Sequence, residues 1–338
     1  MKGKESMRVG GFTIRPQIVL LGIAFLALVI YPWVLTNPFP RHLMIMLLLY
    51  AMMGLGWNIL GGFAGQISVG HGIYFGLGAY TSTMLLMKLG ITPWVGMLGG
   101  VLVAELAALV VGYACFRLGG RYFSMATLVI GEIGRIVFTN FGWVGGAVGL
   151  FLPVLEESFI NFQFHASKIP YYYIILAFTV LAIVTTYVIT KTRLGYYFRA
   201  VRDDPDAARS LGIDITMYKL IALGISVFFT AIGGSFYAQY ILFIDPISTM
   251  NFMISLTITL LVVLGGMGTL WGPIIGAFVL IPITELTRVY WGGAGRAIDL
   301  VIYGALIVLI AIYQPQGLVA MVERYRRKLR NGSTVRSN

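Results

Sequence analysis

Residues 43–60 read LMIMLLLYAMMGLGWNIL, and this stretch decides the class of fold. It lies in a run without Asp, Glu, Lys or Arg that extends to Met87. Residues 43–49 are apolar on every side, whereas a strand of a membrane barrel alternates apolar and polar residues. Because backbone groups in hydrocarbon must be satisfied within the segment, such a run fits a helix, and about 20 residues suffice to cross a bilayer.

The composition of the whole chain favours the same class. Of the 338 residues, 58% are hydrophobic and 11% are charged, whereas soluble domains carry about 25% charged residues. Such a chain has too little polar surface to cover a water-facing globule. Three further charge-free runs cover residues 169–190, 220–244 and 246–284. The single cysteine, Cys115, excludes a disulfide framework or a cysteine-based metal site.

Apolar runs broken by proline, glycine and charge predict an all-α, polytopic transmembrane bundle of about ten spans. We place the spans near residues 17–35, 41–60, 67–89, 93–116, 122–142, 170–190, 218–241, 250–265, 270–290 and 297–314, with boundaries good to about four residues. A basic segment, 1–16, precedes this domain of residues 17–314, and a basic tail, 315–338, follows it. The first run imitates a signal peptide, but no small-residue cleavage site follows, so we predict an uncleaved span. A re-entrant segment would change the count to nine or eleven.

The distribution of charge predicts the orientation. Most of the 24 Lys and Arg residues fall at the two ends and in the loop of residues 191–217. Cytoplasmic segments of membrane proteins carry this excess, so both termini and the loop are predicted to be cytoplasmic. The same clustering argues against nucleic-acid binding as the reason for the net charge of +11.

Five glycines within residues 61–72 predict a broken helix. A break at membrane depth is tolerated where the freed backbone lines a cavity, and a half-helix N-terminus attracts a carboxylate. The candidate substrate-pathway residues here are Gly62, Gly65, Gln66, Ser68, Gly70, His71 and Gly72. The alternative is close helix packing through small residues, with His71 a hydrogen-bonded structural histidine. A second stretch, 265–277, is similar mainly in its glycines, as in transporters built from repeats.

Ionisable residues inside spans form two couples, Glu132 with Arg135 and Glu285 with Arg288. Each couple is spaced i,i+3, so its members share a helix face and can neutralise one another. Glu285–Arg288 lies near a span end and favours a structural pair. Glu132–Arg135 lies mid-span, so both residues are added to the candidate substrate pathway.

The loop of residues 191–217 contains the signals of a short helix. Asp204 is a suitable N-cap, Pro205 a favoured first residue, and Asp206 complements the helix dipole. Gly212 is a natural terminator. These signals predict a capped cytoplasmic helix over 205–211 that docks into a partner, rather than an ordinary solvated loop.

Several motifs of other protein classes are missing from the sequence. It contains no Gly-x-x-x-x-Gly-Lys-Ser/Thr motif for ATP, no Arg-rich voltage sensor, no Thr-Val-Gly-Tyr-Gly filter and no His–Glu metal helix. No nucleophile–base constellation stands out. We therefore expect a transport subunit without its own ATPase, and neither an enzyme nor a holder of metal or cofactor.

Residues 206–212 resemble the Glu-Ala-Ala-x-x-x-Gly coupling motif of bacterial ABC importer permeases, with Asp206 in place of Glu. The surrounding sequence, from about residue 41 to 320, is similar to the M-type branch of the branched-chain amino acid permease family. The stretches that carry this resemblance are residues 61–80 around Gly65-Gln66-Ile67-Ser68, Arg202-Asp203-Asp204, residues 263–273, Tyr303-Gly304 and residues 314–318.

This resemblance implies a multi-pass subunit in the bacterial inner membrane that imports leucine, isoleucine and valine. It implies as partners a homologous second permease, two cytoplasmic ABC ATPases and a periplasmic binding protein. The residues expected to couple transport to the ATPases are Arg202, Asp203, Asp204, Asp206, Ala207, Ala208, Arg209 and Gly212.

Two alternatives to this function stay open. The loop of residues 144–150 is less polar than the family pattern, which leaves import of urea or short-chain amides as a competitor within the same family. A secondary transporter or facilitative channel, gated by Glu132–Arg135 and independent of an ATPase, is the second alternative.

Overall fold

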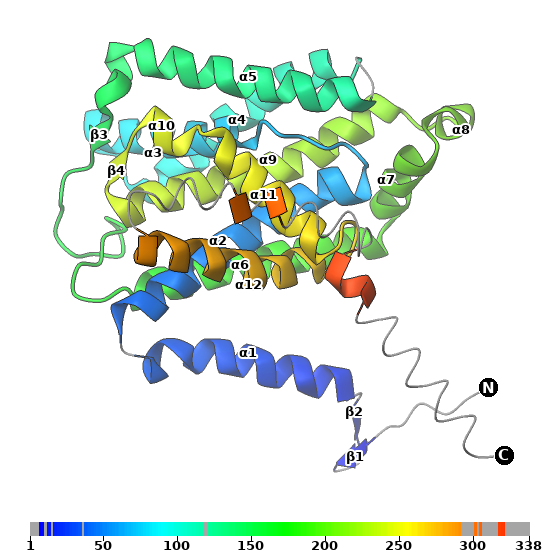
Figure 1. The fold of residues 1–338 in the computed structure, drawn as a ribbon, viewed down its shortest axis with the longest axis horizontal. Coiled ribbons are helices and arrows are strands. Elements are labelled where there is room, and N and C mark those ends of the chain that lie inside the picture. The colour runs from blue at the N-terminus through cyan, green and yellow to red at the C-terminus, as the bar shows by residue number, and fades with distance from the viewer. Residues whose placement is uncertain are drawn as a thin grey trace.

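The computed structural model describes residues 7–9, 12–14, 16–35, 37–117, 120–291, 301–302, 304–305 and 317–321. Within this part of the chain the fold is almost entirely helical (Figure 1). The helices are α1 (Pro16–Val34), α2 (Pro38–Asn58), α3 (His71–Leu89), α4 (Pro93–Cys115), α5 (Gly120–Asn140), α6 (Ile169–Lys191), α7 (Arg193–Asp203), α8 (Pro205–Ser210), α9 (Ile215–Ile241), α10 (Pro246–Thr249), α11 (Phe252–Gly265) and α12 (Gly272–Trp291).

The strands are short and form two antiparallel pairs. β1 (Met7–Val9) pairs with β2 (Phe12–Ile14), and β3 (Leu150–Phe151) pairs with β4 (Phe243–Ile244). The β3–β4 pair lies at one end of the bundle, and α7 and α8 lie at the opposite end (Figure 1).

Seven segments of the described residues are long and apolar enough to cross a membrane. They are Pro38–Phe63, Pro93–Cys115, Tyr122–Asn140, Ile169–Lys191, Ile215–Ile241, Pro246–Gly265 and Gly272–Tyr290. Each coincides with a predicted span. Helices α1 and α3 match two further predicted spans in position, and the tenth, 297–314, lies mostly outside the described residues. The protein is therefore a polytopic helical membrane protein, and the count of ten and the orientation stay predictions.

Helix α2 forms the centre of the bundle and α5 its margin. In the most apolar stretch of α2 and its π-helical extension, 89% of the residues are buried, whereas in that of α5 only 17% are buried. Around α2 pack α6, α9, α11 and α12, while α3, α4 and α9 form a second closely packed group. Figure 1 shows α5 along one edge of the bundle and α1 along the opposite edge.

Small residues bring α3 and α9 into backbone contact. A methyl group on Gly78 would collide with the Ala231 carbonyl, and one on Gly234 would collide with the carbonyl of Phe75. Ser235 Oγ donates to the Gly78 carbonyl at 2.9 Å. Close approach of this kind is typical of helices that pack within a membrane, where small residues replace the hydrophobic driving force.

Candidate functional site

The predicted break in the glycine-rich stretch is confirmed. Helix α2 continues through one π-helical turn, Ile59–Phe63, and α3 begins only at His71. Residues 64–70, which we call the connecting segment, are not helical. Gly65 begins the change of direction with a φ of +71°, a left-handed conformation that glycine adopts without strain.

Side chains satisfy the backbone of the connecting segment. An unpaired peptide group in hydrocarbon costs several kcal/mol, so hydrogen bonds between this backbone and side chains are required. They run from Ser124 Oγ to the Ile67 carbonyl (2.5 Å), from Trp57 Nε1 to the Ser68 carbonyl (2.8 Å) and from the Val69 amide to Thr127 Oγ1 (3.2 Å). Two of these bonds come from α5, which therefore holds the segment along its length.

His71 is fully buried and hydrogen-bonded at both ring nitrogens. Its Nδ1 lies 3.0 Å from Ser68 Oγ and its Nε2 lies 2.7 Å from Ser226 Oγ on α9. Ser68 is equally buried. This geometry fits the structural alternative for His71, in which the ring ties the start of α3 to α9.

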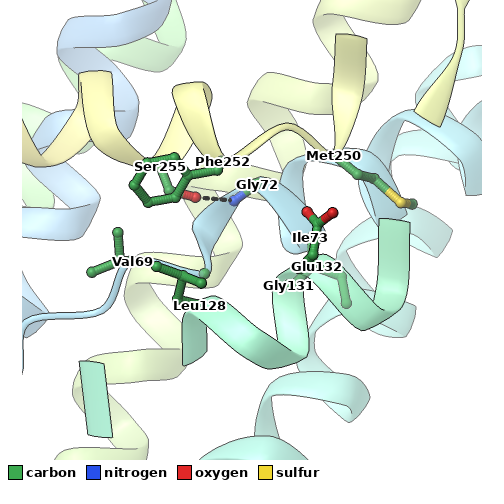
Figure 2. Close-up of a pocket in the computed structure, with 10 residues that line it drawn as sticks. Val69, Gly72, Ile73, Leu128, Gly131, Glu132, Met250, Phe252 and Ser255 are labelled. Carbon is green, nitrogen blue, oxygen red and sulfur yellow. Dashed lines mark hydrogen bonds between the residues drawn. The ribbon is translucent and has the colours of Figure 1, made fainter. Parts of the chain in front are cut away.

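A second helix break faces the first. Helix α10 ends at Thr249, and Asn251 caps α11 by accepting a hydrogen bond from the Met253 amide at 2.9 Å. The Gly72 amide at the start of α3 donates to Ser255 Oγ in α11 at 2.7 Å (Figure 2). A methyl group on Gly72 would lie 2.7 Å from the Asn251 carbonyl oxygen. The N-terminal ends of two helices therefore meet, and only glycine permits this contact.

A pocket of about 110 Å³ lies beside this meeting point. It is several times larger than the roughly 10–15 Å³ of such space that a cavity needs to hold one water. Most of its lining is apolar, and Glu132 and Ser255 supply polar side chains (Figure 2). The lining residues are Val69, Gly70, Gly72, Ile73, Leu128, Gly131, Glu132, Met250, Phe252 and Ser255.

Glu132 and Arg135 form the predicted ion pair near the middle of α5. Arg135 Nε lies 3.0 Å from both carboxylate oxygens, and an Nη2 contact makes the pair bidentate. The Glu132 side chain is 42% exposed and that of Arg135 is 27% exposed. Figure 2 shows the Glu132 carboxylate directed from α5 toward the region of Gly72 and Met250. A charged pair thus borders the pocket on α5, the least buried of the seven apolar segments given above.

Two of the candidate glycines lie in the pocket wall and two lie outside it. Gly70 and Gly72 line the pocket, whereas Gly62 and Gly65 contact Arg202 at the start of the connecting segment. Gln66 is buried, and its backbone N–H donates to the Leu60 carbonyl at 3.0 Å.

Sequence reasoning placed the start of this span at residue 250, close to the observed start of α11 at Phe252, but it did not assign residues 250–255 to the candidate site. The signal that was available is Asn251, a favoured N-cap residue that precedes an apolar run.

The capped helix predicted in the central loop is confirmed as α8. Asp204 Oδ1 accepts hydrogen bonds from the amides of Asp206 and Ala207, both at 3.0 Å. The helix ends at Ser210, one residue before the predicted limit, and Gly212 follows with a φ of +81°. Apart from Ala208 the helix is exposed to its surroundings, and Leu211 beside it is 81% exposed.

A helical bundle whose apolar helices break twice around a pocket, with an ion pair at its wall, has the architecture of a membrane transport protein. Residues 40–311 match the family model of the branched-chain amino acid transport system, permease component. The chain belongs to this family, and the resemblance seen in the sequence is confirmed.

Individual relatives span most of the chain. The high-affinity branched-chain amino acid transport system permease protein LivM of Escherichia coli is 28% identical over 347 residues, covering 96% of this chain and 80% of the relative. LivH of the same organism is 27% identical over 292 residues, covering 81% of this chain and 92% of the relative. The nucleoside ABC transporter permease protein NupC of Lactococcus lactis is 26% identical over 197 residues, covering 52% of this chain and 60% of the relative. No solved structure matches the chain.

Proposed function

We propose that the chain is the permease subunit of an ATP-driven importer of branched-chain and related hydrophobic amino acids in a bacterial inner membrane. The family match over residues 40–311 carries this proposal. Similarity to both LivM and LivH supports pairing with a homologous second permease. The remaining partners are two cytoplasmic ATPases and a periplasmic binding protein, because the sequence has no nucleotide-binding motif of its own.

The pocket between α3, α5 and α11 is the proposed part of the substrate path in this subunit. Val69, Ile73, Leu128 and Phe252 offer an apolar lining for an aliphatic side chain. Glu132 supplies a carboxylate for the ammonium group of a bound amino acid. The N-terminal end of α3 favours the carboxylate of that amino acid. Ser68 and His71 act behind the wall by fixing the start of α3.

The exposure of the Glu132–Arg135 pair supports a partner on α5. A charge that faces lipid near the middle of a span costs at least about 2.5 kcal/mol, so intramembrane charges face protein or water. The pair is nevertheless partly exposed in the isolated chain. We infer that the second permease packs along α5 and that the path runs between the two subunits.

Helix α8 is the proposed docking element for an ATPase. Its caps make it a rigid unit, and its exposed surface leaves it free to enter a groove of a partner. With the basic loop 191–217 and both termini in the cytoplasm, α7 and α8 reach the ATPases and the β3–β4 end faces the binding protein. Ten spans with the tenth at 297–314 complete this orientation.

The test is uptake of radiolabelled leucine into proteoliposomes that contain both permeases and both ATPases. We expect uptake that requires ATP inside and the loaded binding protein outside. The control uses ATPases whose P-loop lysine is replaced. Uptake by the purified chain alone, without any ATPase, would instead establish the secondary transporter or channel.

A different small polar solute is the second candidate cargo. The match to a nucleoside permease over half of the chain favours it, as does the apolar loop of residues 144–150. Urea and short-chain amides belong to this candidate. The measurement that separates the two is the thermal shift of the cognate binding protein with leucine, a nucleoside or urea, because selection by such importers rests mainly with the soluble protein.

A further inference from the structure

Two glycine-rich turns, residues 61–65 and 265–269, lie against each other where α2 passes into the connecting segment. The side-chain amide of Asn58 bridges them: its Oδ1 accepts from the Gly268 amide and its Nδ2 donates to the Thr269 carbonyl, both at 2.8 Å. Asn58 is fully buried. A primary amide is well suited to such a place, because it pairs with a backbone donor and a backbone acceptor at once.

The contact between the turns leaves no room for side chains. A methyl group on Gly62 would collide with both Asn58 Oδ1 and the Gly268 amide nitrogen. Gly268 has a φ of +71°, which also favours glycine. The two turns therefore form one rigid unit around Asn58, and a displacement of one turn displaces the other.

Arg202 joins this unit to the loop that carries α8. Its Nη1 donates to the Gly62 carbonyl at 3.0 Å, while Nε and Nη2 hold Asp203 Oδ1 at 2.9 Å. The residue lies in the last turn of α7, two positions before the Asp204 cap of α8. Gly65 is packed against it, since a methyl group there would lie 3.3 Å from the Arg202 Cα.

The connection continues to the pocket through the connecting segment. From Gly65 this segment runs to Gly70 in the pocket wall, and Ser124 and Thr127 of α5 hold it on the way. A continuous series of covalent and hydrogen bonds thus leads from the cap of α8 to the wall of the pocket.

We propose that Asn58 and Arg202 are positioning residues that pass movements of α8 to the pocket. This inference rests on the proposed function, in which an ATPase moves α8. Arg202 makes the mechanical contact with the two turns, and Asn58 makes the turns respond together. Neither residue lines the pocket, so both act on transport through the connecting segment.

The chemistry of the two side chains suggests discriminating substitutions. Arg202→Lys keeps the charge but cannot hold Gly62 and Asp203 with separate nitrogens in a fixed fork. Asn58→Asp keeps the shape and places a carboxylate against the Thr269 carbonyl, where a donor is required. Arg193→Ala is the matched control, because Arg193 is an exposed arginine in the first turn of the same helix.

The first experiment measures ATP hydrolysed per leucine imported in the complete reconstituted importer. For Arg202→Lys and Asn58→Asp we expect uptake to fall at least tenfold, while ATP hydrolysis stimulated by the loaded binding protein stays within about twofold of the unsubstituted importer. The ratio therefore rises, which a loss of folded protein alone would not cause. Arg193→Ala keeps the original ratio. A ratio that does not change in either variant overturns the proposal.

The second experiment needs no ATPase and separates this inference from the proposed function. In the full chain in nanodiscs, with Cys115→Ala, the pocket residue Ile73→Cys is alkylated by a small maleimide. We expect Arg202→Lys to change the alkylation rate at least threefold and Arg193→Ala to leave it unchanged. Equal rates in all three chains overturn the link between Arg202 and the pocket, whether or not the importer proves to be ATP-driven.

Discussion

The couples Glu132–Arg135 and Glu285–Arg288 have the same residue types and the same spacing but different surroundings. Glu285 is 7% exposed and is contacted by Arg288 at 3.0 Å and by His42 Nε2 at 3.7 Å. Glu132 is 42% exposed and borders a pocket on the margin of the bundle. The spacing establishes an ion pair in both places, and we expect the surroundings to decide between a structural and a transport role.

The largest expected effect is on stability, from Glu285→Gln. Glu285 is the buried member of its pair, and the substitution removes the carboxylate that Arg288 and His42 contact. Because the Arg288 side chain is itself 61% exposed, we expect a cost of about 2 kcal/mol, as for the loss of a hydrogen bond to a charged group. We expect a clear fall in the thermal unfolding midpoint of the detergent-purified chain. The matched variant Glu132→Gln is expected to cost less than about 1 kcal/mol, since that pair is partly exposed. Equal shifts for the two variants would remove the distinction drawn here.

The two variants should rank in the opposite order in their effects on transport. Glu132→Gln removes the charge at the pocket wall, and we expect leucine uptake to fall at least tenfold, which corresponds to about 1.4 kcal/mol. Uptake is measured per folded importer in proteoliposomes, with expression and melting behaviour as controls. Uptake near the original level would place the substrate path elsewhere.

The contribution of His42 is smaller and tests the surroundings of Glu285. His42 contacts this carboxylate and also lies 2.7 Å from the Tyr240 hydroxyl through Nδ1. His42→Phe keeps the ring that stacks on Tyr240 but removes both polar contacts. We expect a loss of about 1 kcal/mol in thermal unfolding and normal uptake. A defect in uptake at normal stability would contradict a purely structural role.

The smallest effect on stability is expected when the two charges on α5 are exchanged. The double variant Glu132→Arg/Arg135→Glu keeps an i,i+3 pair, so the free energy of unfolding should stay within about 0.5 kcal/mol. Uptake should nevertheless remain low, because the carboxylate has moved by almost one turn away from the pocket. Restored uptake would show that the pair matters only as a pair.

Local signals in the sequence predicted much of this molecule. Apolar runs located the long helices because hydrocarbon leaves a backbone few alternatives. Asp204, Pro205 and Gly212 predicted α8 because caps act over a few residues. The i,i+3 spacing predicted both ion pairs for the same reason.

What the sequence did not predict depends on partners far apart in the chain. Gly72 meets Ser255 and His71 meets Ser226, and no spacing rule connects such positions. For this reason the sequence left two roles open for His71 and did not place α11 at the pocket. The role that we propose for Asn58 could not be predicted from the sequence either, since it follows only from the contacts of Asn58 with Gly268 and Thr269.

In the pocket, the residues that hold the backbone in place, which we call the frame, differ from the side chains that form its surface. The frame consists of hydrogen bonds at the two helix breaks, such as that between Gly72 and Ser255. Leu128 and Phe252, in contrast, line the pocket with apolar side chains. Under the proposed function, exchanging these side chains changes the volume offered to a cargo and leaves the frame intact. One scaffold can therefore diverge toward larger or smaller solutes by substitutions at lining positions alone.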